Sequence, residues 1–403
     1  MAQQRVSLRN LHVFASVASN GSVTRSAEIL YRAQSAVTRS ILDLEDQLGV
    51  PLFERKARGM LLNAFGRKLL VRTRRIQEEL GIAKAEGAGP VRQGQAGHLQ
   101  VLMNERRLQT FVELAEHHNL ATVAALRGVS RAAVSASARE LESQLGLTLF
   151  ERSAKGHMPT DAGRALALRA RRALAEWRVI PQEIAAMQGI LAGTVTIGAL
   201  PLARTVLLPQ AIAALVGKHP LVHIHTIESP YEMLVAQLMA GDIDFITGAL
   251  RPAHDDDLQT EVLFSESIAV MARRDHPLTR KRRILDRDLA SASWALSRQG
   301  SPTRELIAHS LAKKGLQAWV PVVETGDLAI LRGLLLHSDM ITAISPQQMR
   351  YELDNGSLVR LNYRLQYTHR DIGIITRRGN MASPVAELLC GYIREVVSGM
   401  PAD

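Results

Sequence analysis

The sequence holds one cysteine, Cys390, among its 403 residues. A single cysteine cannot form a disulfide within the chain, and its Leu-Leu-Cys-Gly-Tyr context is typical of a small apolar side chain buried on a helix. The chain also has no uninterrupted apolar stretch of about 18 residues, and its start lacks the apolar core of a signal peptide. These absences favour a cytoplasmic protein with no membrane partner.

Motifs of common catalytic and cofactor sites are missing as well. We find no His-Glu-x-x-His, no Walker loop, no Gly-x-Ser-x-Gly and no Cys/His spacing of a metal site. We therefore expect neither an enzyme nor a bound cofactor.

Excess positive charge is confined to the first half of the chain. Residues 1–190 contain 27 Lys and Arg against 17 Asp and Glu, whereas residues 191–403 contain 22 of each. The net charge of +10 thus belongs to the first half, where it attracts polyanions such as the phosphates of DNA. A purely solubilising, Arg-rich surface is the alternative explanation.

The basic half contains the same residue pattern twice, at a constant offset of 97 positions. The matched pairs include Leu11 and Leu108, Phe14 and Phe111, Gly49 and Gly146, Arg55 and Arg152, and Gly66 and Gly163. A gapless repeat of this length indicates a duplicated structural unit.

Each copy has the pattern of three helices, a short hairpin and a long helix. In the first copy, helical apolar spacing begins at Leu8, and a third helix is expected over about 34–47. Two short strands around a basic tip follow at 50–62, then a long helix at about 64–84. This order predicts a winged helix-turn-helix, whose third helix enters the major groove of DNA.

Polar and cationic side chains occupy the expected DNA-facing positions. On the third helix they suit base edges, and on the wing they suit phosphates or the minor groove. The first copy supplies Gln34, Ser35, Thr38, Arg39, Arg55, Lys56 and Arg58, and the second supplies Arg131, Ser135, Ser137, Arg152 and Lys155.

The motifs Gln-Ser-Ala-Val-x-Arg, Leu-Glu-x-x-Leu-Gly and Leu-Phe-Glu-Arg resemble the DNA-binding end of LysR-type transcriptional regulators. The resemblance covers residues 8–85 and, with a changed recognition segment, 105–188. It implies that the third helix and the wing contact DNA and that the long helix serves dimerisation. Because Ala136 stands where the first copy has Arg39, the second copy either touches DNA or acts as a spacer or dimerisation element.

The second half alternates short β-rich runs with helices, which predicts a parallel α/β sheet. Strands are expected near 194–198, 222–226, 244–248, 267–271, 294–296, 321–324, 341–344 and 372–376. This half resembles the effector-binding half of LysR-type regulators, which has the two-lobed fold of type 2 periplasmic binding proteins. The resemblance implies a cleft between the lobes for a sugar or an aromatic or organic acid.

The predicted protein is therefore multidomain, with two all-α winged helix-turn-helix modules followed by an α/β two-lobed domain. The modules with their long helices cover 1–85 and 105–190, a Gly-rich flexible linker covers 86–104, and the effector-binding domain covers 191–403. Its lobe one is expected at 193–265 and 369–403, and its lobe two at 266–368.

Effector contacts are expected where strands end and helices begin, since free backbone N–H groups and hydroxyls there can hold a small anion. We select Leu200, Pro201, Thr247, Ser297, Gln299, Ser301, Thr303 and Thr325. For the hydroxyl residues among them, helix capping is the alternative role.

The sequence thus predicts a homodimeric or homotetrameric transcriptional regulator that binds double-stranded DNA, a small-molecule effector and RNA polymerase. Effector binding would reorient the two lobes and change the spacing of the DNA-binding modules. A nucleoid-type architectural DNA-binding protein without an effector is the alternative.

Overall fold

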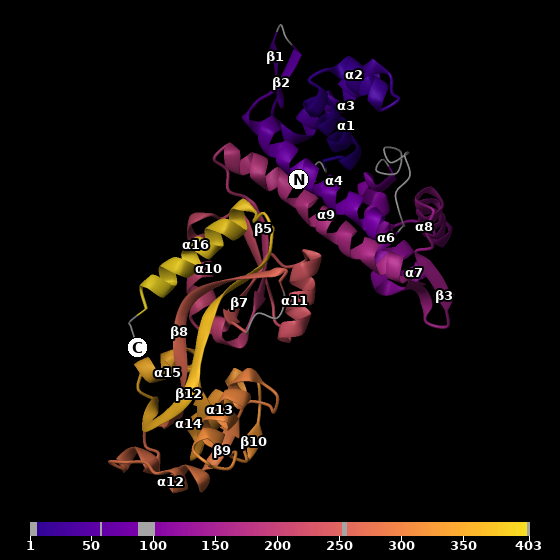
Figure 1. The fold of residues 1–403 in the computed structure, drawn as a ribbon. Coiled ribbons are helices and arrows are strands. Elements are labelled where there is room, and N and C mark those ends of the chain that lie inside the picture. Colours follow the sequence, from indigo (N-terminus) through magenta and orange to yellow (C-terminus); the bar gives the residue numbers. More distant parts are fainter. Residues whose placement is uncertain (1–5, 57–58, 88–100, 252–255, 401–403) are drawn as a thin grey trace. The chain divides into compact units, whose positions relative to one another are not determined.

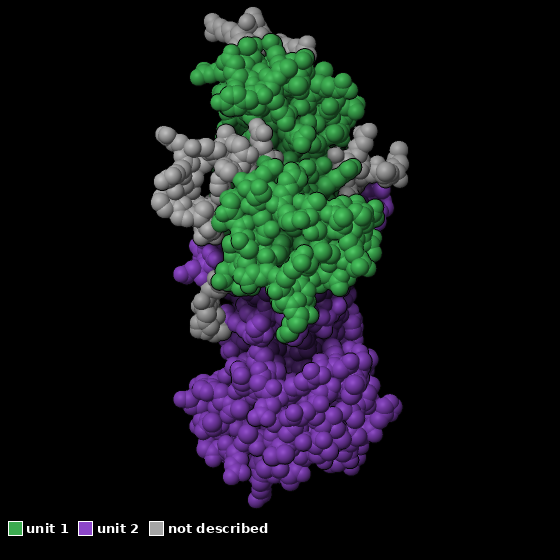
Figure 2. All heavy atoms as spheres, turned by 90° about the vertical axis from the view of Figure 1, so that its right-hand side faces the viewer, with its two compact units in different colours: residues 1–193, 239–242 green, residues 194–238, 243–403 purple. Residues whose placement is uncertain are grey.

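The computed structural model describes residues 6–56, 59–87, 101–251 and 256–400 (Figure 1). The chain forms two compact units (Figure 2). Unit 1 comprises residues 1–193 and 239–242, and unit 2 comprises residues 194–238 and 243–403. Within the described ranges, no helix combines the length and apolar character needed to cross a bilayer.

Unit 1 repeats one order of elements: three helices, a two-stranded hairpin and a long helix. The first copy has α1 (Leu8–Asn20), α2 (Val23–Ile29), α3 (Gln34–Leu48), β1 (Phe53–Lys56), β2 (Gly59–Leu62) and α4 (Ala64–Gly87). The second copy has α6 (Glu105–His117), α7 (Leu120–Arg127), α8 (Arg131–Leu145), β3 (Phe150–Ser153), β4 (Gly156–Pro159) and α9 (Asp161–Met187).

Capping residues set the helix boundaries. The side chains of Ser7 and Ser22 accept backbone hydrogen bonds at the starts of α1 and α2. Gly49 and Gly146 end α3 and α8 with left-handed φ angles of 69° and 65°, a conformation that glycine adopts without steric cost. The helices expected over 34–47 and 64–84 are confirmed and extend slightly further.

A glycine near the start of each long helix permits a close backbone approach. A β-carbon built on Gly66 would lie 2.2 Å from the carbonyl oxygen of Leu52, and one built on Gly163 would lie 2.1 Å from that of Leu149. The segment leading into each wing therefore runs directly against the long helix, and only glycine leaves room for it.

The core of unit 1 is shared by both copies. It includes Leu69 and Leu80 of α4 together with Leu166 and Trp177 of α9. Of the linker predicted at 86–104, residues 88–100 lie outside the described part of the chain. Val101, Leu102 and Met103 are buried in the shared core, so this end of the segment is not a flexible tether.

Unit 2 is built on a sheet with the strand order β10-β9-β11-β8-β12-β7-β5-β6. The strands are β5 (Gly193–Ala199), β6 (Val222–Ile227), β7 (Phe245–Ala249), β8 (Leu258–Arg273), β9 (Ser293–Leu296), β10 (Val323–Glu324), β11 (Met340–Ile344) and β12 (Leu358–Arg377). The α-helices are α10 (Leu207–Lys218), α11 (Tyr231–Ala240), α12 (Asp286–Ala290), α13 (Pro302–Lys313), α14 (Leu328–His337), α15 (Arg350–Asp354) and α16 (Pro384–Ser398). Short 3-10 turns are η1 (Pro201–Arg204), η2 (Pro277–Arg280) and η3 (Pro346–Met349).

This sheet is mixed, which corrects the expectation of a parallel sheet. β5 pairs with β7, and β9 with β10 and β11, in parallel. The long strands β8 and β12 are antiparallel to each other and to their outer neighbours β11 and β7. They run between two lobes, one built on β5, β6 and β7 and the other on β9, β10 and β11 (Figure 1).

Cys390 lies half-buried on α16. Burial raises the pKa of its thiol to about 12, so the nucleophilic thiolate is scarce at neutral pH.

Gly163→Ala is expected to lower the free energy of unfolding by about 1–3 kcal/mol, because the added methyl group meets a backbone carbonyl that cannot move aside. Gly66→Ala has the same effect for the same reason. Urea unfolding followed by circular dichroism measures both.

Gly391→Ala in α16 is the control for these two variants. No atom outside its own helix lies within 4 Å of a β-carbon built there, so alanine leaves stability unchanged or raises it slightly. Wild-type stability of Gly163→Ala would contradict the close approach.

Candidate DNA interface and effector pocket

Helix α3 presents its predicted DNA contacts on one side. Val37 and Ile41 on the other side are buried in the module core. The outward side chains share a surface hollow lined by Gln34, Ser35, Thr38, Arg39, Leu42 and Asp43. Gln34 and Arg39 are exposed, and the Thr38 hydroxyl donates to the Gln34 carbonyl at 3.0 Å. This face can therefore enter a groove without unfolding the module.

Helix α8 presents a different face. Arg131 is exposed and Ser135 half-exposed, at the positions that Gln34 and Thr38 hold in the first copy. Ser137 corresponds to the buried Ser40 and is half-buried itself, so it lies toward the module core. The exposed Arg139, four residues after Ser135, adds a cation that the sequence analysis did not select. Its helical spacing from Arg131 and Ser135 is the signal that could have found it.

The wing residues are described for the second copy only. Arg152 and Lys155 are exposed on the hairpin formed by β3 and β4. Arg55 and Lys56 belong to β1, but their side chains lie outside the described residues, as does the whole of Arg58.

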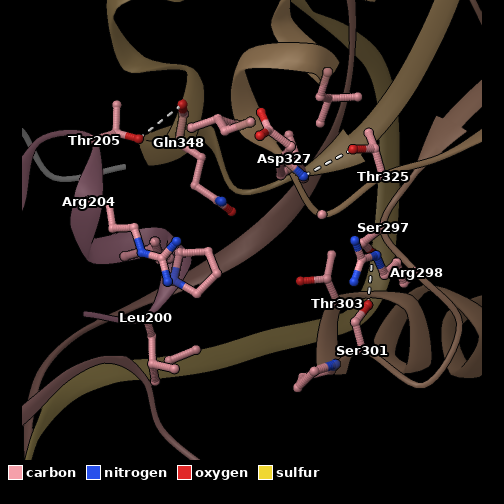
Figure 3. A pocket seen from close by; sticks show the side chains of 18 of the residues that line it. Leu200, Arg204, Thr205, Ser297, Arg298, Ser301, Thr303, Thr325, Asp327 and Gln348 are labelled. Carbon is pink, nitrogen blue, oxygen red and sulfur yellow. Dashed lines mark hydrogen bonds between the residues drawn. The ribbon is translucent and has the colours of Figure 1, made fainter. Parts of the chain in front are cut away.

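Unit 2 holds a cavity of about 990 Å³ between its lobes (Figure 3). Six of the predicted effector contacts line it, namely Leu200, Pro201, Ser297, Ser301, Thr303 and Thr325. In Figure 3, Leu200 and Arg204 of the first lobe lie opposite Arg298, Ser301 and Thr303 of the second. No group of three His, Cys, Asp or Glu that could hold a metal occurs in the described ranges.

Two predicted effector contacts do not line this cavity. Thr247 is fully buried within β7, where its hydroxyl donates to the carbonyl of Gly373 at 3.2 Å. Gln299 is exposed in the loop before α13 and is not among the lining residues. A position near a strand end was therefore not enough to predict pocket lining, because the sequence does not show which way a side chain on the strand or in the following loop points.

The hydroxyl groups of the pocket also serve its own structure. The Ser301 side chain caps α13 by accepting from the Arg304 amide at 3.3 Å, and its hydroxyl donates to Ser297 at 2.9 Å. The Thr303 hydroxyl accepts from Arg370 at 3.1 Å. Helix capping and pocket lining are thus combined in Ser301.

The main feature that the sequence analysis missed is a set of cationic side chains. The cavity is lined by Arg204, Arg251, Arg298, Arg332 and Arg370 and, among acidic residues, by Glu228 and Asp327. Arg204 and Arg298 lie in the same loops as residues that the sequence analysis selected, so their position in the sequence could have identified them as pocket residues. Arg370 had none, because it lies on the part of β12 that the sequence did not predict.

Most of these arginines face a carboxylate. Arg370 pairs with Glu266 at 2.8 Å, while Arg251 pairs with Glu232 and Arg332 with Glu352. Partial burial lowers the pKa of Arg204, an effect that the nearby Glu228 carboxylate opposes. Arg298 makes no ion pair with any residue in the described part of the chain and is exposed at the cavity. It is the cation best placed to meet a bound anion.

Two family models match the chain. The LysR substrate binding domain matches residues 188–398, and the bacterial regulatory helix-turn-helix protein, lysR family, matches residues 8–67 and 106–164. The chain belongs to the LysR family of transcriptional regulators. Members of this family are DNA-binding regulators with an effector domain, not enzymes.

Among curated relatives are proteins that match almost the whole chain and proteins that match part of it. The HTH-type transcriptional regulator GalR of Pseudomonas putida is 44% identical over 394 residues, which is 97% of each chain. The regulator YfeR of Shigella flexneri is 28% identical, and the match covers 93% of YfeR but only 72% of this chain. The match with GalR therefore spans both copies of the repeat, whereas the match with YfeR leaves part of this chain uncovered.

Solved structures of regulators show the same fold over part of the chain. A full-length OxyR variant from Pseudomonas aeruginosa aligns with a TM-score of 0.54 and 24% identity, covering 72% of this chain and 94% of its own. The full-length regulator CbnR in complex with its target DNA aligns with a TM-score of 0.51 and 18% identity, covering 73% and 99%.

Helices α3 and α8 differ at their N-cap position, which gives a matched test. Ser130 caps α8 by accepting from the Ala133 amide at 3.1 Å, whereas Ala33 at the equivalent position of α3 makes no side-chain cap. Ala33→Ser is expected to raise the free energy of unfolding by about 1 kcal/mol, and Ser130→Ala to lower it by a similar amount. Thermal denaturation of the two variants checks both, and a destabilising Ala33→Ser would show that the copies are not equivalent here.

Proposed function

We propose that this LysR-family regulator binds promoter DNA through both winged helix-turn-helix modules and responds to a small organic anion held in the pocket of unit 2. The modules with their long helices are residues 1–85 and 105–190, and the effector-binding domain is residues 191–403. The effector is an aromatic or aliphatic carboxylic acid rather than a neutral sugar. The observation that carries this choice is the exposed Arg298 guanidinium at the pocket, which makes no ion pair within the described part of the chain.

An unpaired cation in the cavity favours an anion. Five arginines and two carboxylates line the cavity, and three of these arginines pair with acids that do not line it. Arg298 keeps an unpaired guanidinium, which can form a bidentate, charge-assisted hydrogen bond with a carboxylate. The hydroxyls of Thr303 and Thr325 line the same cavity and can accept or donate further hydrogen bonds.

The position of the pocket supports coupling to DNA binding. Because residues of both lobes line the cavity, a ligand that contacts Arg204 and Arg298 at once favours one relative arrangement of the lobes. In a homodimer or homotetramer, that change alters the spacing of DNA-binding modules and the access of RNA polymerase. An architectural DNA-binding protein has no need of such a cavity, so we do not favour that function.

The proposal is tested by gel-shift and footprinting assays of the full chain on the genomic fragments that it retains. We expect one or a few specific fragments, and a changed footprint with a carboxylic acid from a panel of aliphatic and aromatic acids. Neutral sugars are the comparison. Retention of every fragment alike, with no acid effective, would favour the architectural protein instead.

Arg298→Gln is expected to weaken binding of the effective acid by about 10–100-fold, because a charge-assisted hydrogen bond contributes about 1.5–3 kcal/mol. Isothermal titration of the full chain measures the dissociation constant. Arg282→Gln, an exposed arginine that does not line the cavity, is the matched control and keeps wild-type affinity. Equal affinities of the two variants would remove Arg298 from the site.

A further inference from the structure

The long helices of the two copies pack against each other through a ladder of ion pairs. Lys68 pairs with Glu183 at 3.2 Å, Arg75 with Glu176 at 2.8 Å, and Glu79 with Arg169 at 3.3 Å. As the position along α4 increases, the partner on α9 moves toward the start of that helix. The two helices are therefore antiparallel.

The middle of this ladder is buried. Arg72 is 1% exposed and contacts both Glu176 and Glu183, which are each 4% exposed. Burial disfavours the charged guanidinium, but the hydrogen bonds and negative charges of the two glutamates outweigh this effect and raise the pKa of Arg72. Charges this deeply buried are tolerated only with their partners in place, so the network fixes the register of α4 on α9.

The pairing has approximate twofold symmetry. The repeat offset of 97 relates Arg72 to Arg169 and Glu79 to Glu176, so the pairs Arg72–Glu176 and Arg169–Glu79 are equivalent. In addition, the Leu8 amide donates to Glu105 at 3.2 Å, and these two residues are themselves repeat equivalents. Such reciprocal contacts define an isologous interface, the kind that two identical subunits form. Here a single chain forms it.

The shared core ties the modules together beyond the ladder. The Trp177 indole of α9 donates to the carbonyl of Val6, before α1, at 2.7 Å. Apolar residues from α1, α3, α4 and α9 belong to one continuous cluster. The two modules therefore pack together as one unit and are not separate domains joined only by a linker.

The two recognition faces of this pair are unlike. Where α3 has Gln34 and Arg39, α8 has Arg131 and Ala136. Glutamine pairs well with adenine and arginine with guanine, whereas alanine offers only an apolar contact to a thymine methyl group. The faces therefore prefer different base sequences.

We propose that the two modules of one chain act as a built-in dimer that recognises two unlike half-sites in inverted orientation. The inverted orientation follows from the twofold relation of the modules, and the unlike half-sites follow from their different faces. This inference rests on the proposed function, since it requires both modules to bind DNA. The DNA site bound by each chain is then an asymmetric operator with two half-sites.

The first test maps the half-sites by hydroxyl-radical footprinting on the specific fragment that the full chain retains. One variant removes the first face (Gln34→Ala with Arg39→Ala), and its matched counterpart removes the second (Arg131→Ala with Ser135→Ala). All four side chains are exposed or half-exposed, so folding is preserved. We expect each variant to lose protection of a different half-site. The affinity should fall by about 10²–10⁴-fold, the gain that linking two binding modules provides.

The outcomes separate the inference from the proposed function. If removal of the second face leaves footprint and affinity unchanged, the inference is overturned while DNA binding by the first module stands. If both variants lose the same half-site, the half-sites do not belong to different modules of one chain. If the intact chain retains no specific fragment, the proposed function itself fails.

The second test asks whether the pairing lies within one chain. A zero-length carbodiimide is expected to link Lys68 to Glu183 in the wild-type protein, giving a cross-linked peptide within the monomer band. Two differently tagged chains are then co-expressed, one wild-type and the other with Lys68→Gln, which leaves the buried Arg72 network intact. The Lys68→Gln chain cannot form this link internally. A covalent dimer joined through residues 68 and 183 would show that α4 pairs with α9 of another chain and would overturn the inference.

Discussion

The contact on which unit 1 depends is the burial of Arg72 between Glu176 and Glu183. An isolated arginine in this position would be very unfavourable, and removal of one partner of a buried ion pair costs about 3–5 kcal/mol. Apolar contacts between α4 and α9 can stabilise the pair in several registers, because they are not directional. The buried ion pairs form in one register only. The ladder thus holds the two copies of the repeat as a pair of defined geometry, which sets the relative positions of α3 and α8.

A buried ion pair also joins two elements of unit 2. Glu266 on β8 and Arg370 on β12 are register partners, 1% and 9% exposed, in the two strands that run between the lobes. Arg370 also donates to Thr303 at the cavity. A buried ion pair therefore links the connecting strands to the pocket wall.

Local sequence signals predicted the helices well and the connecting strands poorly. Serine caps and left-handed glycines such as Ser22 and Gly49 mark helix ends regardless of tertiary context, because they satisfy backbone groups within a few residues. Only residues 267–271 of β8 and 372–376 of β12 were predicted. The rest of β8 is largely exposed and the pairing with β12 contains register shifts, so neither segment shows the alternation of a half-buried strand.

By itself, the sequence determined the duplication, the concentration of positive charge on the duplicated half, and the hydroxyl residues of the pocket such as Ser301 and Thr303. These are properties of residue type and spacing along the chain. The tertiary structure alone decided that α4 pairs with α9 and that Arg204, Arg298 and Arg370 meet around one cavity. The sequence of an apolar helix face, or of the segment around an arginine, does not identify its contact partner. The partner lies roughly a hundred residues away, and packing and charge in three dimensions bring the two together.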